Sequence, residues 1–136
     1  FDTPVELPWD GLFVNQGPLR WIANDGAKPG RSGTVSVLHA SADWSRRHLE
    51  MDQEDVVKAL LEDFSTIVGQ SLPAVVWSSA HRWLYSFADG PLEIDCLWDG
   101  DLGIGACGDW CHGARIEGAW LSGEALAGRV LGSAAR

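Results

Sequence analysis

The segment from Leu102 to Leu131 holds the residues whose types and spacing best suit cofactor chemistry. A run of small residues ends at Gly108-Asp109, and a helix is expected to open at Glu117-Gly118-Ala119. Small residues let a backbone approach a ligand closely. An acidic residue at a strand end can accept hydrogen bonds from sugar hydroxyls, and a helix N-terminus offers free N–H groups with a partial positive charge. The segment therefore predicts a site for an anion, or for a ring that gains negative charge on reduction.

Other kinds of chemistry fit the sequence less well. Cys107, Cys111 and His112 could contribute to a zinc site, but a structural zinc ion usually needs a second pair of ligands. Apart from scattered histidines, only Cys96 remains to supply it, so no metal site is predicted. Ser122 falls inside the expected helix without a histidine or carboxylate at triad-like spacing, which argues against nucleophilic catalysis.

Two basic segments could serve binding or structure. His81 and Arg82 could orient a phosphate or carboxylate of a substrate, or Arg82 could form a structural ion pair, and the sequence leaves both open. Lys28-Pro29-Gly30-Arg31 is typical of an exposed loop.

Composition narrows the class of protein. The 136 residues suffice for one compact domain, and 46% apolar with 21% charged residues is typical of a soluble globular protein. A net charge of -9 argues against a nucleic-acid partner. No apolar run approaches the roughly 20 residues that span a bilayer, so no membrane partner is expected. The three cysteines cannot all pair within one chain, which favours reduced thiols and a cytoplasmic protein.

The first half of the chain predicts a small antiparallel sheet followed by two helices. Short apolar or alternating runs separated by turns indicate three strands, at residues 12–14, 19–23 and 34–39. Ser41 or Ser45 can cap a short helix that runs towards Leu49. Asp52 can cap a second helix, in which apolar residues recur at helical spacing until Gly69 ends it.

The second half predicts extended segments and one final helix. The extended segments cover residues 74–77, 82–87, 94–98 and 102–107, with a turn at Asp99-Gly100. The final helix is expected from Gly118 to Leu131. The fold class predicted is therefore α+β.

The order of these motifs resembles a known family. The strand, Gly-Asp, loop and EGAxxSGxxxA pattern is similar to the C-terminal FAD-contacting element of the amine oxidase superfamily. More closely, GDWCHGARIEGAWLSGEALA, together with the upstream LRWIANDGAKPGR, LHASADWS and HRWLYS, resembles the bacterial renalase-like NAD(P)/FAD-dependent oxidoreductases. This resemblance extends from about Asp10 to the end of the chain.

The resemblance implies a flavoprotein with non-covalent FAD and a set of site residues. Asp109 would lie at the ribityl and pyrophosphate region, and the backbone from Ile116 to Ala119 would meet the pyrimidine edge of the flavin. The full set of cofactor-binding residues implied is Gly108, Asp109, Arg115, Ile116, Glu117, Gly118 and Ala119. Gly118 and Gly123 would keep the helix near the cofactor, and Trp83, Tyr85 and Trp120 are the candidates for the substrate side of the ring.

The chain departs from the family pattern in one respect. Such enzymes begin with a strand, a GxGxxG turn and a helix that bind the FAD pyrophosphate, and no segment of these 136 residues fits that pattern. The resemblance therefore implies a C-terminal fragment of an FAD-dependent oxidase, in which residues 1–100 are part of the substrate domain. Residues 101–136 would be the last strand and helix of a Rossmann-like FAD-binding domain whose N-terminal half is missing.

This interpretation carries expectations about activity and partners. The parent protein would transfer hydride from a reduced nicotinamide-like or amine donor to FAD and then to oxygen, whereas the fragment alone would be inactive. Its partners would be a small-molecule electron donor and the missing N-terminal half. Unsatisfied apolar surface on the final helix would favour a homodimer. The competing hypothesis is a stand-alone ligand-binding or interaction domain without redox activity.

Overall fold

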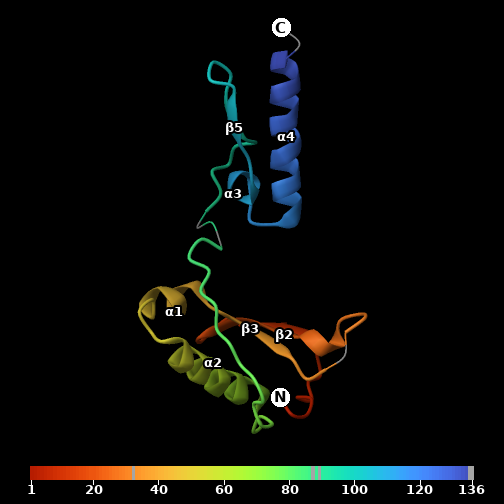
Figure 1. Ribbon diagram of the computed structural model, residues 1–136, viewed down its shortest axis with the longest axis vertical. Coiled ribbons are helices and arrows are strands. Elements are labelled where there is room, and N and C mark those ends of the chain that lie inside the picture. The colour runs from red at the N-terminus through yellow and green to blue at the C-terminus, as the bar shows by residue number, and fades with distance from the viewer. Residues whose placement is uncertain (32, 87, 89, 135–136) are drawn as a thin grey trace. The chain divides into compact units, whose positions relative to one another are not determined.

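The computed structural model describes residues 1–31, 33–86, 88 and 90–134, and gives Ala134 by its backbone alone. It divides into two compact units, an N-terminal unit (Phe1–Arg82) and a C-terminal unit (Trp83–Arg136). Both combine small antiparallel sheets or hairpins with helices (Figure 1). The α+β class predicted from the sequence is therefore confirmed.

The N-terminal unit contains a three-stranded antiparallel sheet in the order β1-β2-β3. Its strands are β1 (Gly11–Phe13), β2 (Leu19–Asn24) and β3 (Ser36–Ala40). Ile22 in the central strand pairs with Leu12 on one side and with Leu38 on the other. All three strands lie within one or two residues of the positions predicted from the sequence. A short 3₁₀ helix, η1 (Asp25–Ala27), follows β2.

Helices α1 (Ala42–Arg47) and α2 (Gln53–Val68) also match their predicted places. The hydroxyl of Ser41 accepts a hydrogen bond from the Trp44 backbone N–H at 3.3 Å, which caps α1. Asp52 occupies the N-cap position of α2 without a side-chain capping bond. Gly69 ends α2 with φ 69°, a left-handed conformation that glycine adopts without steric cost.

The hydrophobic core of the N-terminal unit lies between α2 and the sheet. Phe64 of α2 and Ile22 of β2 are completely buried there. The core contains Val5, Leu19, Ile22, Trp44, Leu60 and Phe64. The helical spacing of the apolar residues therefore correctly predicted a helix that covers the sheet.

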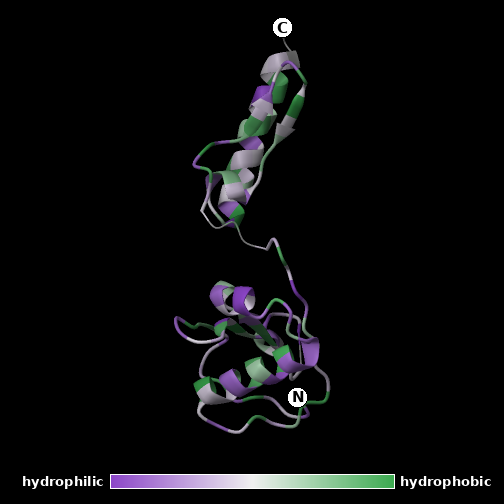
Figure 2. Cartoon of the chain, turned by 90° about the vertical axis from the view of Figure 1, so that its left-hand side faces the viewer, coloured by the Kyte–Doolittle hydropathy of each residue, from purple (hydrophilic) through white to green (hydrophobic). Residues whose placement is uncertain are grey.

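The C-terminal unit consists of a hairpin and two helices. Strands β4 (Leu97–Asp99) and β5 (Ile104–Ala106) pair antiparallel, and α3 (Asp109–His112) and α4 (Ile116–Ala134) follow. Helix α4 begins two residues before the predicted start and ends three after the predicted end. Figure 2 shows apolar segments, in green, recurring along this helix towards the C-terminus. Helix α3 was not predicted, because four residues are too few to show a period.

The segment between Ser71 and Ser86 forms no strand. Val76 and Trp77 are 72% and 77% exposed. The carbonyl of Ala74 accepts one hydrogen bond, from the backbone N–H of Asp2 at 2.9 Å, but no ladder extends from it. Residues 74–77 are irregular, with a bend at Val76, and residues 84–86 form a turn and a bend, so the extended segments predicted at 74–77 and 82–86 are wrong. Phe87 lies outside the described residues.

The boundary between the compact units lies at residues 82/83, earlier than the predicted domain boundary at 100/101. Because β4 precedes residue 100 and β5 follows it, the hairpin spans the predicted boundary. The assignment of the two parts to a substrate domain and an FAD-binding domain remains a prediction. Among the helices of the described residues, none has the length and apolar character that crossing a membrane requires.

Candidate functional site

A solvent-open pocket of about 380 Å³ lies in the C-terminal unit where α3 gives way to α4. Its lining residues are Asp109, Ala114, Arg115, Ile116 and Ala119. Four of these five belong to the predicted cofactor-binding set, and Ala114 lies outside that set. The other members of the set, Gly108, Glu117 and Gly118, do not line the pocket. The volume is within the range of about 300–1,000 Å³ that is usual for small-molecule sites. A larger pocket of about 520 Å³, lined by α2 and residues 71–78, contains none of the predicted site residues.

The first turn of α4 supplies hydrogen-bond donors beside this pocket. The carbonyl of Arg115 accepts the first bond of the helix, from the Ala119 N–H at 3.0 Å. Within the described part of the chain, the N–H groups of residues 116–118 have no hydrogen-bond partner. Such groups carry the positive end of the helix dipole, and α4 is long enough, at 19 residues, to present it fully. An acceptor or an anion would therefore be stabilised here.

Close backbone packing fixes the start of α4. Gly118 is buried, and a Cβ at this position would lie 2.2 Å from the carbonyl oxygen of Gly113. Gly113 itself has φ 131°, which favours glycine, and its carbonyl accepts a bond from the Arg115 N–H at 2.7 Å. The absence of a side chain at Gly118 therefore allows the backbone of Gly113 to pack directly against the first turn of α4. At Gly123, by contrast, a Cβ would meet nothing within 4 Å.

Ser122, which the sequence analysis considered only as a nucleophile, has a structural role. It is completely buried, and its hydroxyl accepts a hydrogen bond from the Gly108 N–H at 3.2 Å and donates one to the Asp95 carbonyl at 2.6 Å. This buried hydroxyl therefore both donates and accepts a hydrogen bond, and the two bonds connect α4 to the residues that precede and follow the hairpin. Its place one turn after buried Gly118 is the signal that could have identified it.

Gly108 and Asp109 begin the unpredicted helix α3. A Cβ on Gly108 would lie 2.3 Å from Nε1 of Trp110, so a larger residue here would force the indole ring to move. Asp109 lines the pocket, and its backbone carbonyl accepts a bond from the Gly113 N–H at 2.7 Å. Asp109 is therefore held at the end of the chain segment that leaves the hairpin.

The three aromatic candidates for the substrate side lie in the C-terminal unit and outside the pocket lining. Trp83, Tyr85 and Trp120 are 74%, 96% and 63% exposed. Large exposed aromatic rings are available to a flat ligand or to another protein surface. Their predicted role remains a prediction.

The basic segments have structural partners. The guanidinium of Arg82 donates a hydrogen bond to the Met51 carbonyl at 3.3 Å. The loop of residues 28–31 is exposed, as predicted. Lys28 and Arg31 also form ion pairs with the buried carboxylate of Asp25, which anchor the loop. Hydrogen bonds from Lys28 and then Arg31 lower the pKa of Asp25.

The cysteines and His112 show no shared metal site. In the described part of the chain, no three histidine, cysteine or acidic side chains are grouped as metal ligands would be. His112 lies 3.6 Å from the carboxylate of Asp95, measured from Nε2 to Oδ1. Cys96, Cys107 and Cys111 are free thiols.

Comparison with known families identifies the class of protein. Residues 14–131 match the family model described as flavin containing amine oxidoreductase. The chain belongs to this family. The match covers both compact units, and it confirms the superfamily indicated by the sequence motifs. Members of such a family are oxidoreductases that use a flavin cofactor.

Proposed function

We propose that this chain is part of an FAD-dependent oxidoreductase in which the start of α4 binds the polar edge of the flavin ring. The observation that carries the proposal is the pocket beside the unpartnered N–H groups of residues 116–118. The pyrimidine edge of a flavin presents acceptor atoms, and these become more negative on reduction. Donors at a helix N-terminus therefore favour the reduced form over the oxidised form.

The other pocket residues have complementary roles in this proposal. The carboxylate of Asp109 accepts hydrogen bonds from ribityl hydroxyls, and the exposed guanidinium of Arg115 supplies positive charge for the pyrophosphate. Glu117 favours the helix through the dipole, as acidic residues in a first turn do. Bound FAD supplies the hydride acceptor, while the chain supplies position and charge. Binding is non-covalent.

The electron donor is a reduced nicotinamide-like molecule or an amine, as in the renalase-like enzymes that the motifs resemble. Trp83, Tyr85 and Trp120 provide flat apolar surfaces against which such a donor packs. Because hydride transfer to a flavin depends mainly on position, no further acid or base is required from these residues.

A segment that is not among these 136 residues completes the cofactor site. No GxGxxG turn before a helix occurs here to bind the pyrophosphate. The C-terminal unit exposes apolar side chains that such a segment would cover, including Ile104, Ile116 and Leu131, which are 64%, 93% and 70% exposed. The missing segment belongs to the same protein in this proposal, and a separate chain with a different sequence is the alternative source.

The test begins with protein expressed from the complete gene. We expect flavin absorption bands, release of FAD on denaturation, and bleaching of the bands under anaerobic conditions with NADH, NADPH or an amine. A colourless protein that takes up no added FAD would contradict the proposal. Reduction by amines but not by nicotinamides would contradict the renalase-like subtype alone.

A charge-insertion variant tests the site itself. Ala119→Glu places a carboxylate in the pocket, where it repels reduced flavin, while remaining compatible with the first turns of a helix. We expect FAD affinity to fall about tenfold, equivalent to about 1.4 kcal/mol. Ala127→Glu, on an exposed part of the same helix, is the matched control and should leave affinity unchanged. Equal affinity in both variants would place the flavin elsewhere.

A further inference from the structure

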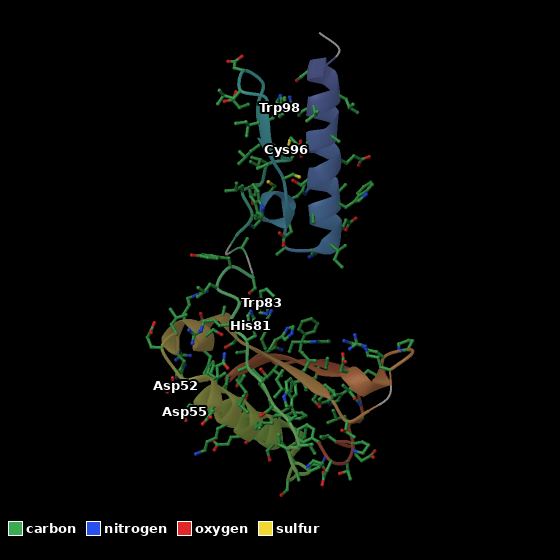
Figure 3. The ribbon with its side chains drawn as sticks, in the orientation of Figure 1. Asp52, Asp55, His81, Trp83, Cys96 and Trp98 are labelled. Atoms are coloured by element: carbon green, nitrogen blue, oxygen red, sulfur yellow. The ribbon has the colours of Figure 1, made fainter. Side chains whose placement is uncertain are left out.

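The register of the β4–β5 hairpin, extended by one residue beyond its last strand pair, sets two cysteines opposite each other. Leu97 pairs with Ala106, Trp98 with Gly105 and Asp99 with Ile104. The next pair in this antiparallel register is Cys96 with Cys107. Figure 3 shows Cys96 and Trp98 on the same segment as it runs beside α4. Opposite residues in an antiparallel pair present their side chains on one face.

A separate contact holds the chain together on the far side of this pair. Asp95 and Gly108, the next residues outward, both bond to the hydroxyl of Ser122, at 2.6 and 3.2 Å. The two cysteines are therefore confined between the last strand pair and a shared hydrogen-bond bridge. Since both ends are fixed, the backbones cannot separate at Cys96 and Cys107 without breaking one of these contacts.

This confinement meets the requirement for a disulfide. Opposite residues of antiparallel strands have Cα atoms about 4.5–5.5 Å apart. Disulfide-linked cysteines need about 4.4–6.8 Å. Cys107 is exposed, so a small oxidant can reach it, whereas Cys96 is half-buried and Cys111 is completely buried. Access and geometry therefore favour one pair among the three thiols.

We propose that Cys96 and Cys107 are a site of reversible oxidation that forms a cross-strand disulfide with a peroxide oxidant. The Cys107 thiolate attacks one peroxide oxygen, the O–O bond breaks, and Cys107 becomes a sulfenic acid as the first water leaves. Cys96 then attacks the Cys107 sulfur, forming the S–S bond and expelling the second water. Two thiols and one hydrogen peroxide give one disulfide and two water molecules. A thiol reductant reverses the reaction.

The position of this pair links oxidation to the pocket. Cys107 immediately precedes Gly108 and Asp109, and Asp109 lines the pocket. A bond between Cys96 and Cys107 fixes the segment that leads into α3. The proposal itself rests on the hairpin register and holds whether or not the pocket binds FAD.

The chain is well suited to a peptide-mapping test. All three cysteines lie between Arg82 and Arg115 without an intervening lysine or arginine, so trypsin cannot separate them. An endoproteinase that cleaves before aspartate places Cys96 in residues 95–98, Cys107 in 101–108 and Cys111 in a peptide beginning at 109. The protein is treated with hydrogen peroxide, denatured without reductant, alkylated and cleaved.

We expect alkylation of the Cys96 and Cys107 peptides to fall in parallel by about fivefold or more. A linked peptide pair about 2 Da lighter than its two thiol components should appear, and dithiothreitol should remove it. Alkylation of Cys111 should not change. Loss of alkylation at Cys107 with Cys96 unaffected, or a Cys107–Cys111 link, would overturn the proposal.

Two variants separate this pair from general thiol oxidation. In Cys96→Ser the linked peptide disappears, and Cys107 proceeds to the sulfinic acid, which dithiothreitol does not reverse. In Cys111→Ala the linked peptide forms as in the unmodified sequence. Circular dichroism before oxidation establishes that each variant is folded. A linked peptide that requires Cys111 would contradict the proposed pairing.

Discussion

The hydroxyl of Ser122 joins three parts of the C-terminal unit through two hydrogen bonds. Its partners, the Gly108 N–H and the Asp95 carbonyl, flank the hairpin and lead into the pocket segment. Removing a buried hydroxyl leaves both backbone groups without this partner, at a cost of roughly 1–3 kcal/mol. A residue that does no chemistry thus positions the residues proposed to bind the cofactor.

We therefore expect Ser122→Ala to lower the free energy of unfolding of the C-terminal unit by about 1–3 kcal/mol in urea denaturation. Hydrogen exchange at the Gly108 amide should accelerate in the same variant. Ser133→Ala is the matched control, because Ser133 is exposed and its hydroxyl bonds only within α4. Equal stability of the two variants would show that the bridge contributes nothing measurable.

Asp25 offers a pH test in the N-terminal unit. Its pKa is lowered by Lys28 and Arg31, so its ionised form stabilises the folded state above the ordinary aspartate pKa of 3.8. That contribution is lost as the pH falls through the lower, folded-state pKa. We expect Asp25→Asn to be less stable than the unmodified protein at pH 7, with the difference shrinking below about pH 4.

The measurement is urea denaturation at several pH values between neutrality and pH 3. Asp43→Asn is the control, because Asp43 is 80% exposed in its pair with Arg46 and should give a small difference at every pH. A difference for Asp25→Asn that does not change with pH would contradict the ion-pair explanation.

At the scale of elements, α4 contains glycines with opposite environments. Gly118 is pressed against the Gly113 backbone, whereas a Cβ on Gly128 would meet nothing within 4 Å. In an exposed helix interior, alanine stabilises the helix by about 1 kcal/mol relative to glycine. The steric conflict at position 118 opposes this gain, and nothing opposes it at position 128.

We expect Gly118→Ala to lower the melting temperature of the C-terminal unit and Gly128→Ala to raise it. The same substitution in the same helix should thus have opposite signs, measured by circular dichroism at the helical wavelength. An increase in both variants would mean that the start of α4 adapts without cost to a larger residue.

At the scale of the whole molecule, the two compact units differ in how well they bury apolar surface. The N-terminal unit has a core with Leu19, Ile22 and Phe64 at 1%, 0% and 0% exposure. The C-terminal unit leaves Leu102, Ile104 and Leu131 at 71%, 64% and 70% exposure. A small unit with so much exposed apolar surface is marginally stable without a partner.

We expect residues 1–82 expressed alone to unfold cooperatively, and Phe64→Ala to remove about 3–5 kcal/mol of that stability. Residues 83–136 alone should bind a hydrophobic dye and self-associate in sedimentation experiments. Ser65→Ala, at an exposure intermediate between core and surface, is the control for the N-terminal unit. A non-cooperative transition for residues 1–82 would contradict an independent core.

The sequence by itself determined the features that depend on neighbouring residues. Short apolar or alternating runs between turns predicted the three-stranded sheet, and helical spacing with Gly69 predicted α2 and its end. The family resemblance implied a cofactor-binding set that includes four of the five residues lining the α4 pocket. Motif order also indicated the flavin-containing amine oxidoreductase family before the family match. In each case the information lies within a short stretch of the sequence. The spacing of apolar residues and the residues that begin or end a helix are both local features.

Only the tertiary structure decided the features that join distant positions. It placed Ser122 between Asp95 and Gly108, set the hairpin register from which the Cys96–Cys107 pair follows, and brought Lys28 and Arg31 to Asp25. It also left residues 74–77, which were predicted as an extended segment, without a partner strand in the described chain. Strand register and side-chain packing decide such contacts. The two partners of each bond lie far apart in the sequence, and a local pattern describes only one of them at a time.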